Sequence, residues 1–215
     1  MIRRFVMQDG EMGSGGRLIV LTGPSGVGKG TLLQLLLKRH PELVLSISAT
    51  TRSPREGEVD GKDYFFLSRE QFEQLQASQQ LLEWAEFADN YYGTPRQPVE
   101  ENIRMGRSVV LEIELVGARQ VRQLFPQAFT IFLLPPSLEE LERRLRSRGK
   151  DSSLSIERRL ARAKAEIPAA PEFDLQVVND DLDKAIAAIE AALFTQVAPH
   201  NDIADAQAGS PTTHR

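Results

Sequence analysis

Residues 18–31 read Leu18-Ile19-Val20-Leu21-Thr22-Gly23-Pro24-Ser25-Gly26-Val27-Gly28-Lys29-Gly30-Thr31. The stretch opens with a continuous apolar run, which is typical of a strand buried on both faces of a parallel sheet. Leucines then recur at helical spacing, at Leu32, Leu33, Leu36 and Leu37. The glycine-rich segment therefore joins a buried strand to the start of a helix.

This segment has the spacing of a phosphate-binding loop. Glycines let backbone amides turn inward around phosphate oxygens, and the helix N-terminus adds the positive end of its dipole. Lys29 then brings a mobile charge to the β and γ phosphates of ATP and is predicted to be catalytic. A glycine-rich turn with a chance lysine is the alternative, but it does not account for the full spacing. The residues predicted to bind ATP here are Gly23, Pro24, Ser25, Gly26, Val27, Gly28, Lys29, Gly30 and Thr31.

The metal ion is harder to place. Gly30 occupies the position after Lys29, where the strict pattern has a Ser or Thr hydroxyl for Mg²⁺, and Thr31 comes one residue later. We therefore expect Mg²⁺ to bind together with ATP, with water completing its shell. No residue is assigned as a metal ligand.

The rest of the chain alternates short apolar runs with helical patterns. Further buried strands are predicted at 109–111 and 131–134, and a last strand at 174–178; each is followed by a helix. Strands separated by helices favour a doubly wound α/β core around a parallel sheet. We expect one domain, residues 17–194, whose core comprises residues 17–49, 96–142 and 168–194.

Two segments interrupt this alternation. From about residue 50 to residue 95 the apolar runs are short and aromatic, which predicts a small antiparallel sheet. A helix between its strands would be capped by Ser68 and Gln71. From about residue 143 to residue 167, a helical segment rich in arginine is interrupted at Gly149. We interpret both segments as insertions into one core.

Composition limits the class of partner. The chain has 215 residues, with 26 Lys and Arg against 30 Asp and Glu and a net charge of −4, which argues against general nucleic-acid binding. It has no Cys, and no apolar run approaches the ~18 residues of a membrane span. Residues 1–16 lack the apolar core of a signal peptide and are expected to be flexible, and the polar tail 195–215 is expected to be disordered. We expect a cytoplasmic protein without nucleic-acid or membrane partners, and no protein partner is evident.

Three further stretches carry a resemblance to a known family. They are residues 46–64, the triplet Glu83-Trp84-Ala85 and the run Asn90-Tyr91-Tyr92-Gly93-Thr94-Pro95. Together they closely resemble the GMP-binding region of guanylate kinases, which belong to the nucleoside-monophosphate kinase group of P-loop kinases. The resemblance extends from Arg17 to Phe194. It implies direct in-line transfer of a phosphoryl group from ATP to GMP, and also to dGMP, in purine nucleotide metabolism.

The resemblance assigns GMP binding to Ser48, Arg52, Arg55, Tyr64, Glu83, Tyr92, Thr94, Glu112 and Glu114. Arg52 and Arg55 are expected to be catalytic and to face the GMP phosphate, because the planar guanidinium fork binds phosphate oxygens in pairs. Tyr64 and Tyr92 would donate to the same phosphate. Glu83 would bind the base, since its two oxygens match the N1–H and N2 amine of guanine, whereas adenine has an acceptor at N1. Solvated loop contacts for these arginines and a strand-surface role for the glutamate are the alternative.

Glu112 and Glu114 follow the strand at 109–111, at the end of a parallel strand where open α/β sheets bind ligands. The family usually has aspartate at both positions. One carboxylate is expected near Mg²⁺ or its waters and the other near the base, and the residues alone do not decide which. Capping of the next helix, or exposure to solvent, is the alternative.

The arginine-rich insertion resembles the lid of these kinases. The resemblance implies that Arg144, Arg148 and Arg159 are catalytic and close over the phosphates, neutralising charge and excluding water. Arg143, Arg146 and Arg158 are assigned to surface or salt-bridge roles. Asn179, after the last strand, is expected either beside the adenine of ATP or in a helix N-cap turn.

Two other functions are compatible with parts of this pattern. A kinase of the same fold with AMP or dTMP as acceptor would need another group in place of Glu83. A catalytically inactive module that binds a phosphopeptide or protein would be expected to lose the loop lysine or the lid arginines, but Lys29, Arg148 and Arg159 are all present. Fold alone does not separate these functions.

Overall fold

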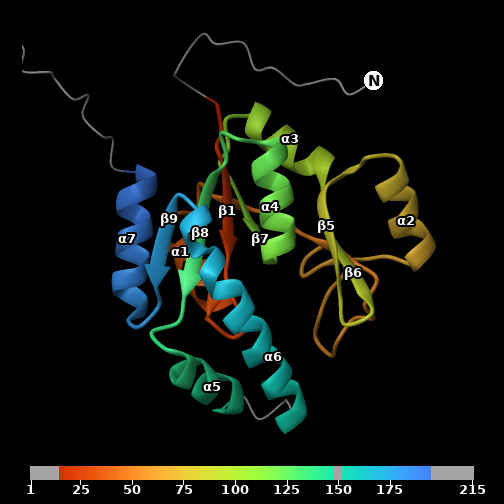
Figure 1. The fold of residues 1–215 in the computed structure, drawn as a ribbon. Helices are drawn as coiled ribbons and strands as arrows, with labels where there is room; N and C mark the ends of the chain where they lie inside the picture. The colour runs from red at the N-terminus through yellow and green to blue at the C-terminus, as the bar shows by residue number, and fades with distance from the viewer. Residues whose placement is uncertain (1–14, 148–151, 195–215) are drawn as a thin grey trace, which may run out of the picture.

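A computed structural model describes residues 15–147 and 152–194 of the chain. Its central feature is a sheet of five parallel strands (Figure 1). In spatial order these are β2 (Val44–Leu45), β7 (Val109–Glu112), β1 (Leu18–Thr22), β8 (Phe129–Leu134) and β9 (Leu175–Val178). The strand order runs outward from β1 in both directions, which confirms the predicted doubly wound α/β core. The two-residue strand β2 was not predicted, because neither of its side chains is fully buried and its pattern is too short to detect.

Helices cover both faces of this sheet because its central strand is apolar on both sides. Leu18 and Val20 point to one face, where they pack with residues of α3 (Arg96–Arg104), α4 (Leu115–Leu124) and the 3₁₀ helix η1 (Ile167–Glu172). Ile19 and Leu21 point to the opposite face, toward α1 (Lys29–Arg39) and α7 (Leu182–Phe194). The alternation of side chains along one strand thus builds two hydrophobic cores.

A second sheet lies beside the first (Figure 1). Its strand order is β4 (Phe65–Phe66), β3 (Ala49–Thr50), β6 (Asn90–Pro95) and β5 (Leu81–Phe87). Helix α2 (Arg69–Ala77) covers it, and Ser68 and Gln71 form the predicted capping box. The expectation of an antiparallel sheet is wrong for one pair, since β3 and β4 are parallel. A parallel pair needs a long connection, and residues 51–64 provide it.

The arginine-rich insertion forms two helices, α5 (Leu138–Ser147) and α6 (Ser153–Glu166). They lie beyond the carboxyl ends of the parallel strands, at the bottom of the view in Figure 1. Leu141 and Leu145 of α5 pack on Ile156 and Ala163 of α6, which gives the insertion a small core of its own. The expected interruption at Gly149 lies outside the described residues.

The described residues also mark where the folded domain begins. Gly16 donates its amide to the Ile103 carbonyl at 3.2 Å, and a Cβ at this position would lie 2.0 Å from the Arg107 carbonyl oxygen. Gly16 is therefore packed against the body of the protein. The remaining parts of the two expected tails, residues 1–14 and 195–215, lie outside the description. Within the described ranges, none of the helices is long and apolar enough to cross a membrane.

Candidate active site

The phosphate loop connects β1 to α1 as predicted, and its shape depends on glycine. Gly23, Gly26 and Gly28 have φ values of +145°, +91° and +104°, a region that other residues rarely adopt. A Cβ at Gly23 would lie 2.3 Å from the Leu133 carbonyl oxygen of the neighbouring strand. Gly28 is the N-cap of α1, so the loop ends where the unpaired amides of the helix begin. The backbone is thus arranged to receive an anion.

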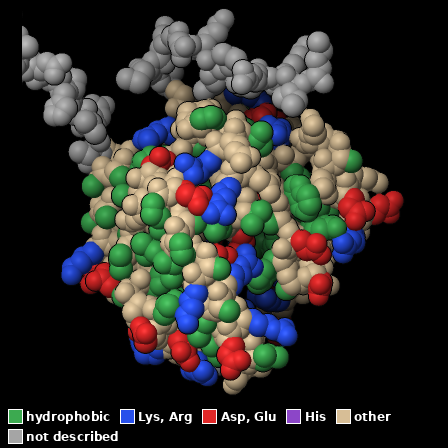
Figure 2. All heavy atoms as spheres, viewed as in Figure 1, with side chains coloured by type: hydrophobic (Ala, Val, Ile, Leu, Met, Phe, Trp, Pro, Cys, Tyr) green, Lys and Arg blue, Asp and Glu red, His purple; other side chains and the backbone are tan. Residues whose placement is uncertain are grey.

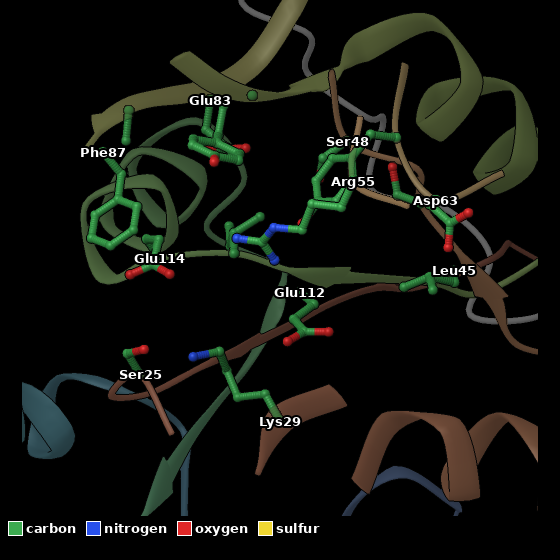
Figure 3. Close-up of a pocket in the computed structure, with 16 residues that line it drawn as sticks. Ser25, Lys29, Leu45, Ser48, Arg55, Asp63, Glu83, Phe87, Glu112 and Glu114 are labelled. Atoms are coloured by element: carbon green, nitrogen blue, oxygen red, sulfur yellow. The ribbon is translucent and has the colours of Figure 1, made fainter. Parts of the chain in front are cut away.

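Lys29 folds back over this loop. Its Nζ donates to the carbonyl oxygens of Gly23 at 2.6 Å and Pro24 at 3.3 Å. Figure 3 shows the ammonium group at the edge of a pocket, on the same side as Ser25 and close to Glu112. The lysine therefore lies between the loop and the pocket.

Two side chains from outside the loop hold its backbone. The Asn179 amide donates its Nδ2 hydrogen to the Val27 carbonyl at 2.8 Å, and the side chain is buried. Arg144 of α5 donates to the Asn179 carbonyl at 2.8 Å and to the Val27 carbonyl at 3.3 Å. Glu140 accepts from the Nε of the same arginine and from Arg143, and these bonds lower the pKa of its carboxyl to about 2.

These contacts give Asn179 and Arg144 a role that the sequence did not indicate. Both brace the phosphate loop in this structure, and their predicted contacts with adenine and with phosphate remain predictions. The N-cap alternative for Asn179 is wrong, because Asp181 is the side chain that accepts the amide of Lys184 at the start of α7. Arg148 lies outside the described residues, and Arg159 is half-buried on α6.

A pocket of about 360 Å³ opens between the phosphate loop and the second sheet. Figure 2 shows a recess between this sheet and the main body, with Lys and Arg side chains along it. Figure 3 shows side chains from both parts of the molecule converging on the pocket. The predicted site residues that line it are Ser25, Lys29, Ser48, Arg55, Tyr64, Glu83, Tyr92, Glu112 and Glu114.

Glu83 is the most buried acidic group of the pocket, with 5% of its surface exposed. It lies on β5 and accepts a hydrogen bond from the Thr94 hydroxyl at 2.6 Å. Burial, with a smaller contribution from the nearby charge of Glu114, raises the pKa of its carboxyl to about 7, against the lowering effect of the Thr94 bonds. The Thr94 hydroxyl bonds only Oε1 of Glu83. The Glu83 carboxylate can therefore still accept hydrogen bonds from a ligand with two adjacent donors.

Helix α4 holds this glutamate in place through residues that sequence reasoning missed. A Cβ at Gly117 would lie 2.1 Å from Glu83 Oε2, so the carboxylate occupies the space that a side chain would fill. Gln120 accepts from the Trp84 amide at 3.1 Å and donates to the Trp84 carbonyl at 2.8 Å, which joins β5 to α4 beside the glutamate. A glycine inside a predicted helix was the available signal for this close approach.

Arg52 and Arg55, the two arginines predicted to face the GMP phosphate, differ in their surroundings. Arg52 binds both oxygens of Glu58 at 2.9 Å and lies over the Tyr64 ring at 5.4 Å. Its bonds to Glu58 keep its pKa raised despite partial burial. Arg55 instead points into the pocket (Figure 3), and among the described residues it forms no ion pair. In this arrangement Arg55 is available to a phosphate, whereas Arg52 is engaged with Glu58.

The two carboxylates after β7 also take different positions. Glu112 faces Lys29, and burial raises the pKa of its carboxyl while the lysine charge opposes that shift. Glu114 is the N-cap residue of α4 but makes no side-chain capping bond, so the helix-cap alternative is wrong for it. Its Oε2 accepts from Arg162 of α6 at 2.9 Å. Arg162 was not singled out in the sequence, because it lies among several arginines on one helix.

The fold and the loop together define a P-loop nucleotide-binding protein, with a parallel sheet, a glycine-rich strand-to-helix turn and a lysine at its end. A family model for guanylate kinase matches residues 15–196. The guanylate kinase of Thermosynechococcus vestitus is 66% identical over 180 residues, which cover 84% of this chain and 94% of that protein. The guanylate kinase of Trichormus variabilis is 64% identical over 184 residues, covering 86% and 92%.

A solved structure supports the same conclusion. The crystal structure of guanylate kinase from Anaplasma phagocytophilum superimposes with a TM-score of 0.69 at 36% identity, covering 83% of this chain and 85% of that one. The chain therefore belongs to the guanylate kinase family, and the predicted fold is confirmed.

Proposed function

We propose that this enzyme transfers the γ-phosphoryl group of ATP to GMP, giving ADP and GDP, by direct in-line displacement without a covalent enzyme intermediate. Family membership supports the reaction. The single observation that carries the choice of acceptor is the buried Glu83 carboxylate at the pocket end opposite Lys29 (Figure 3). The same geometry fits dGMP, because recognition of the base does not involve the ribose.

Base selection follows from the chemistry of Glu83. Guanine offers N1–H and N2–H donors side by side, which an ionised carboxylate accepts as a pair. Adenine places a lone pair at N1 and would leave the buried carboxylate facing another acceptor, and unmet buried polar groups are costly. Thr94 and Gly117 fix the orientation of the carboxylate, so it is set for the base before the ligand arrives.

The phosphate of GMP is proposed to lie between the base site and the phosphate loop. Arg55 supplies charge there, and the Tyr64 and Tyr92 hydroxyls supply donors from the second sheet. Arg52 would join them by leaving Glu58, and Arg144, Arg148 and Arg159 would act from the lid. No general base is needed, because the GMP phosphate is already an anionic nucleophile. Catalysis then consists of alignment and neutralisation of charge on the transferred group.

The family reaction uses ATP with Mg²⁺, and the residues present fit such an ion. A Cβ at Gly30 would lie 3.9 Å from Glu112 Oε2, so one carboxylate faces the start of α1 beside Lys29. Magnesium is commonly held by one or two carboxylates, substrate phosphates and water. Glu112 is the residue we propose to hold it, directly or through water. The ion would neutralise charge on the β and γ phosphates.

The test is a coupled assay of ADP formation from ATP with GMP, dGMP, AMP, dTMP, UMP or CMP as acceptor. We expect GMP and dGMP to be phosphorylated with a kcat/KM at least about a hundredfold above that for AMP. A preference for AMP or dTMP would contradict the assignment of the acceptor. Tight GMP binding with no turnover would favour an inactive binding module instead. The cytoplasmic location expected from the sequence remains a prediction.

A further inference from the structure

Arg162 of the lid helix α6 contacts residues from all three parts of the molecule. Its NH2 group donates to Glu114 Oε2 at 2.9 Å, at the start of α4 in the core. Its guanidinium carbon lies 4.7 Å from the centre of the Phe87 ring, on β5 of the second sheet. Its Nε donates to Glu166 Oε1 at 2.6 Å, one turn further along its own helix. Because Glu166 is buried, this bond fixes the guanidinium group of Arg162 relative to helix α6.

Two of the three residues that Arg162 contacts line the pocket in which GMP is proposed to bind, the acceptor pocket. Glu114 and Phe87 line it and lie next to each other in Figure 3. The Phe87 ring also packs at 6.4 Å from Tyr92, which is expected to bind the GMP phosphate. The arginine itself does not line the pocket, so it acts through these neighbours and not on the nucleotide.

The pocket lining has more acidic than basic residues, so a partner that neutralises one of the carboxylates favours binding of an anion. The lining includes four acidic residues, Asp63, Glu83, Glu112 and Glu114, against two basic ones, Lys29 and Arg55. A nucleoside monophosphate is an anion, and excess negative charge in a cleft of low dielectric constant lowers its affinity. Asp63 accepts the Val59 amide and Glu112 faces Lys29. Glu114 has Arg162 as its ion-pair partner.

We propose that Arg162 is a positioning residue for the acceptor site, which neutralises Glu114 and holds it, together with Phe87, in the arrangement that binds GMP. The inference rests on the proposed function and adds a determinant of acceptor affinity. It also joins the lid to the base side of the pocket, so the lid helix contributes to binding of the acceptor as well as to enclosure of the phosphates.

The test compares Arg162→Ala with Arg158→Ala, an exposed arginine on the same helix. We expect Arg162→Ala to raise the KM for GMP about five- to tenfold, as loss of a partly exposed charge-assisted bond implies, with kcat and the KM for ATP within about twofold of wild type. Arg158→Ala should leave all three unchanged. Arg162→Lys keeps the charge without the fork and should recover part of the GMP affinity.

A double-mutant cycle with Glu114→Gln separates this role from a general structural one. If the two residues act as a pair, Arg162→Ala should change the KM for GMP much less in the Glu114→Gln background than in the wild type. Additive effects would overturn the proposal, as would an Arg162→Ala variant that matches Arg158→Ala. A parallel rise in both KM values together with a lower melting temperature would also overturn it. Failure of the wild type to phosphorylate GMP would instead contradict the proposed function.

Discussion

The phosphate loop and the acceptor pocket are built in opposite ways. The loop is one continuous segment between β1 and α1, and it presents mainly backbone groups shaped by glycines with positive φ. The acceptor pocket is assembled from side chains of β5, β6, β7 and the connection between β3 and β4, with α4 and α6 supporting them. One site depends on local conformation, and the other depends on how distant elements pack.

Because of this difference, we expect the two sites to tolerate different substitutions. The shape of the backbone site depends on its glycines, on the flanking strand and helix, and on the two side chains that hold the loop. Its chemistry is concentrated in one side chain, Lys29. A side-chain site depends on many neighbours, and each of them contributes a smaller share. Substitutions in the two regions should therefore differ in size and in the substrate that they affect.

The largest effect is expected at Lys29, which carries the mobile charge of the backbone site. Lys29→Met should keep the fold but lower turnover at least about a thousandfold, because charge on the transferred group is no longer neutralised. Lys38→Met, at an exposed position of the same helix, is the matched control. Steady-state kinetics and a melting curve are the measurements. A folded Lys29→Met protein with near wild-type turnover would refute the role given to the lysine.

The next largest effect is expected at Glu83 and tests recognition of the base of GMP. Glu83→Gln places an amide donor against a guanine N–H, and we expect kcat/KM for GMP to fall about tenfold to a hundredfold. The reaction with AMP should fall much less, and the KM for ATP should hardly change. Glu86→Gln, at an exposed position of the same strand, should behave as wild type. Equal losses for GMP and AMP would make Glu83 structural and leave base selection to other residues.

Substitution of Asn179 tests whether the phosphate loop needs the hydrogen bond from this side chain to keep its shape. Asn179→Ala removes the donor to the Val27 carbonyl, and the loosened loop should raise the KM for ATP about tenfold, the cost of one buried hydrogen bond. The KM for GMP should stay within about twofold. Asn102→Ala removes a similar amide that binds Pro98 in α3, far from the loop, and serves as control. An unchanged KM for ATP would show that the loop holds its shape alone.

The smallest effect is the dependence on pH of kcat/KM for GMP. Burial raises the pKa of Glu83 to about 7, and only the ionised carboxylate accepts both guanine donors. Between pH 8 and pH 6, the kcat/KM of the wild type for GMP, divided by that of Glu83→Gln, should therefore fall about five- to tenfold. Division by the variant's value removes the effect of the titration of GMP itself, which is the same for both proteins. A ratio that is constant with pH would contradict the raised pKa.

The same shift has a consequence for stability. Because the folded protein favours the neutral carboxyl, Glu83 lowers the free energy of unfolding progressively as pH rises from its ordinary pKa toward 7. The free energy of unfolding of Glu83→Gln, relative to that of the wild type, should therefore be higher at pH 8 than at pH 4.5. Denaturant unfolding at the two pH values measures this difference.

Some features of this protein were determined by the sequence alone. The strand at residues 18–22, the glycines and Lys29 predicted the loop and the α/β core, and both the fold and the family are confirmed. Such features are readable because strand burial, glycine conformation and helix spacing are local properties of consecutive residues. The capping box at Ser68 was predicted for the same reason.

Other features were decided only by the tertiary structure. The parallel pairing of β3 with β4, the bracing of the loop by Asn179, and the contact between Gly117 and Glu83 all join residues distant in sequence. Arg162 is one of several arginines on a polar helix, and nothing local distinguishes it from Arg158. Its partner depends on where α6 packs, because a charge acquires a function from the groups that folding brings within reach of it.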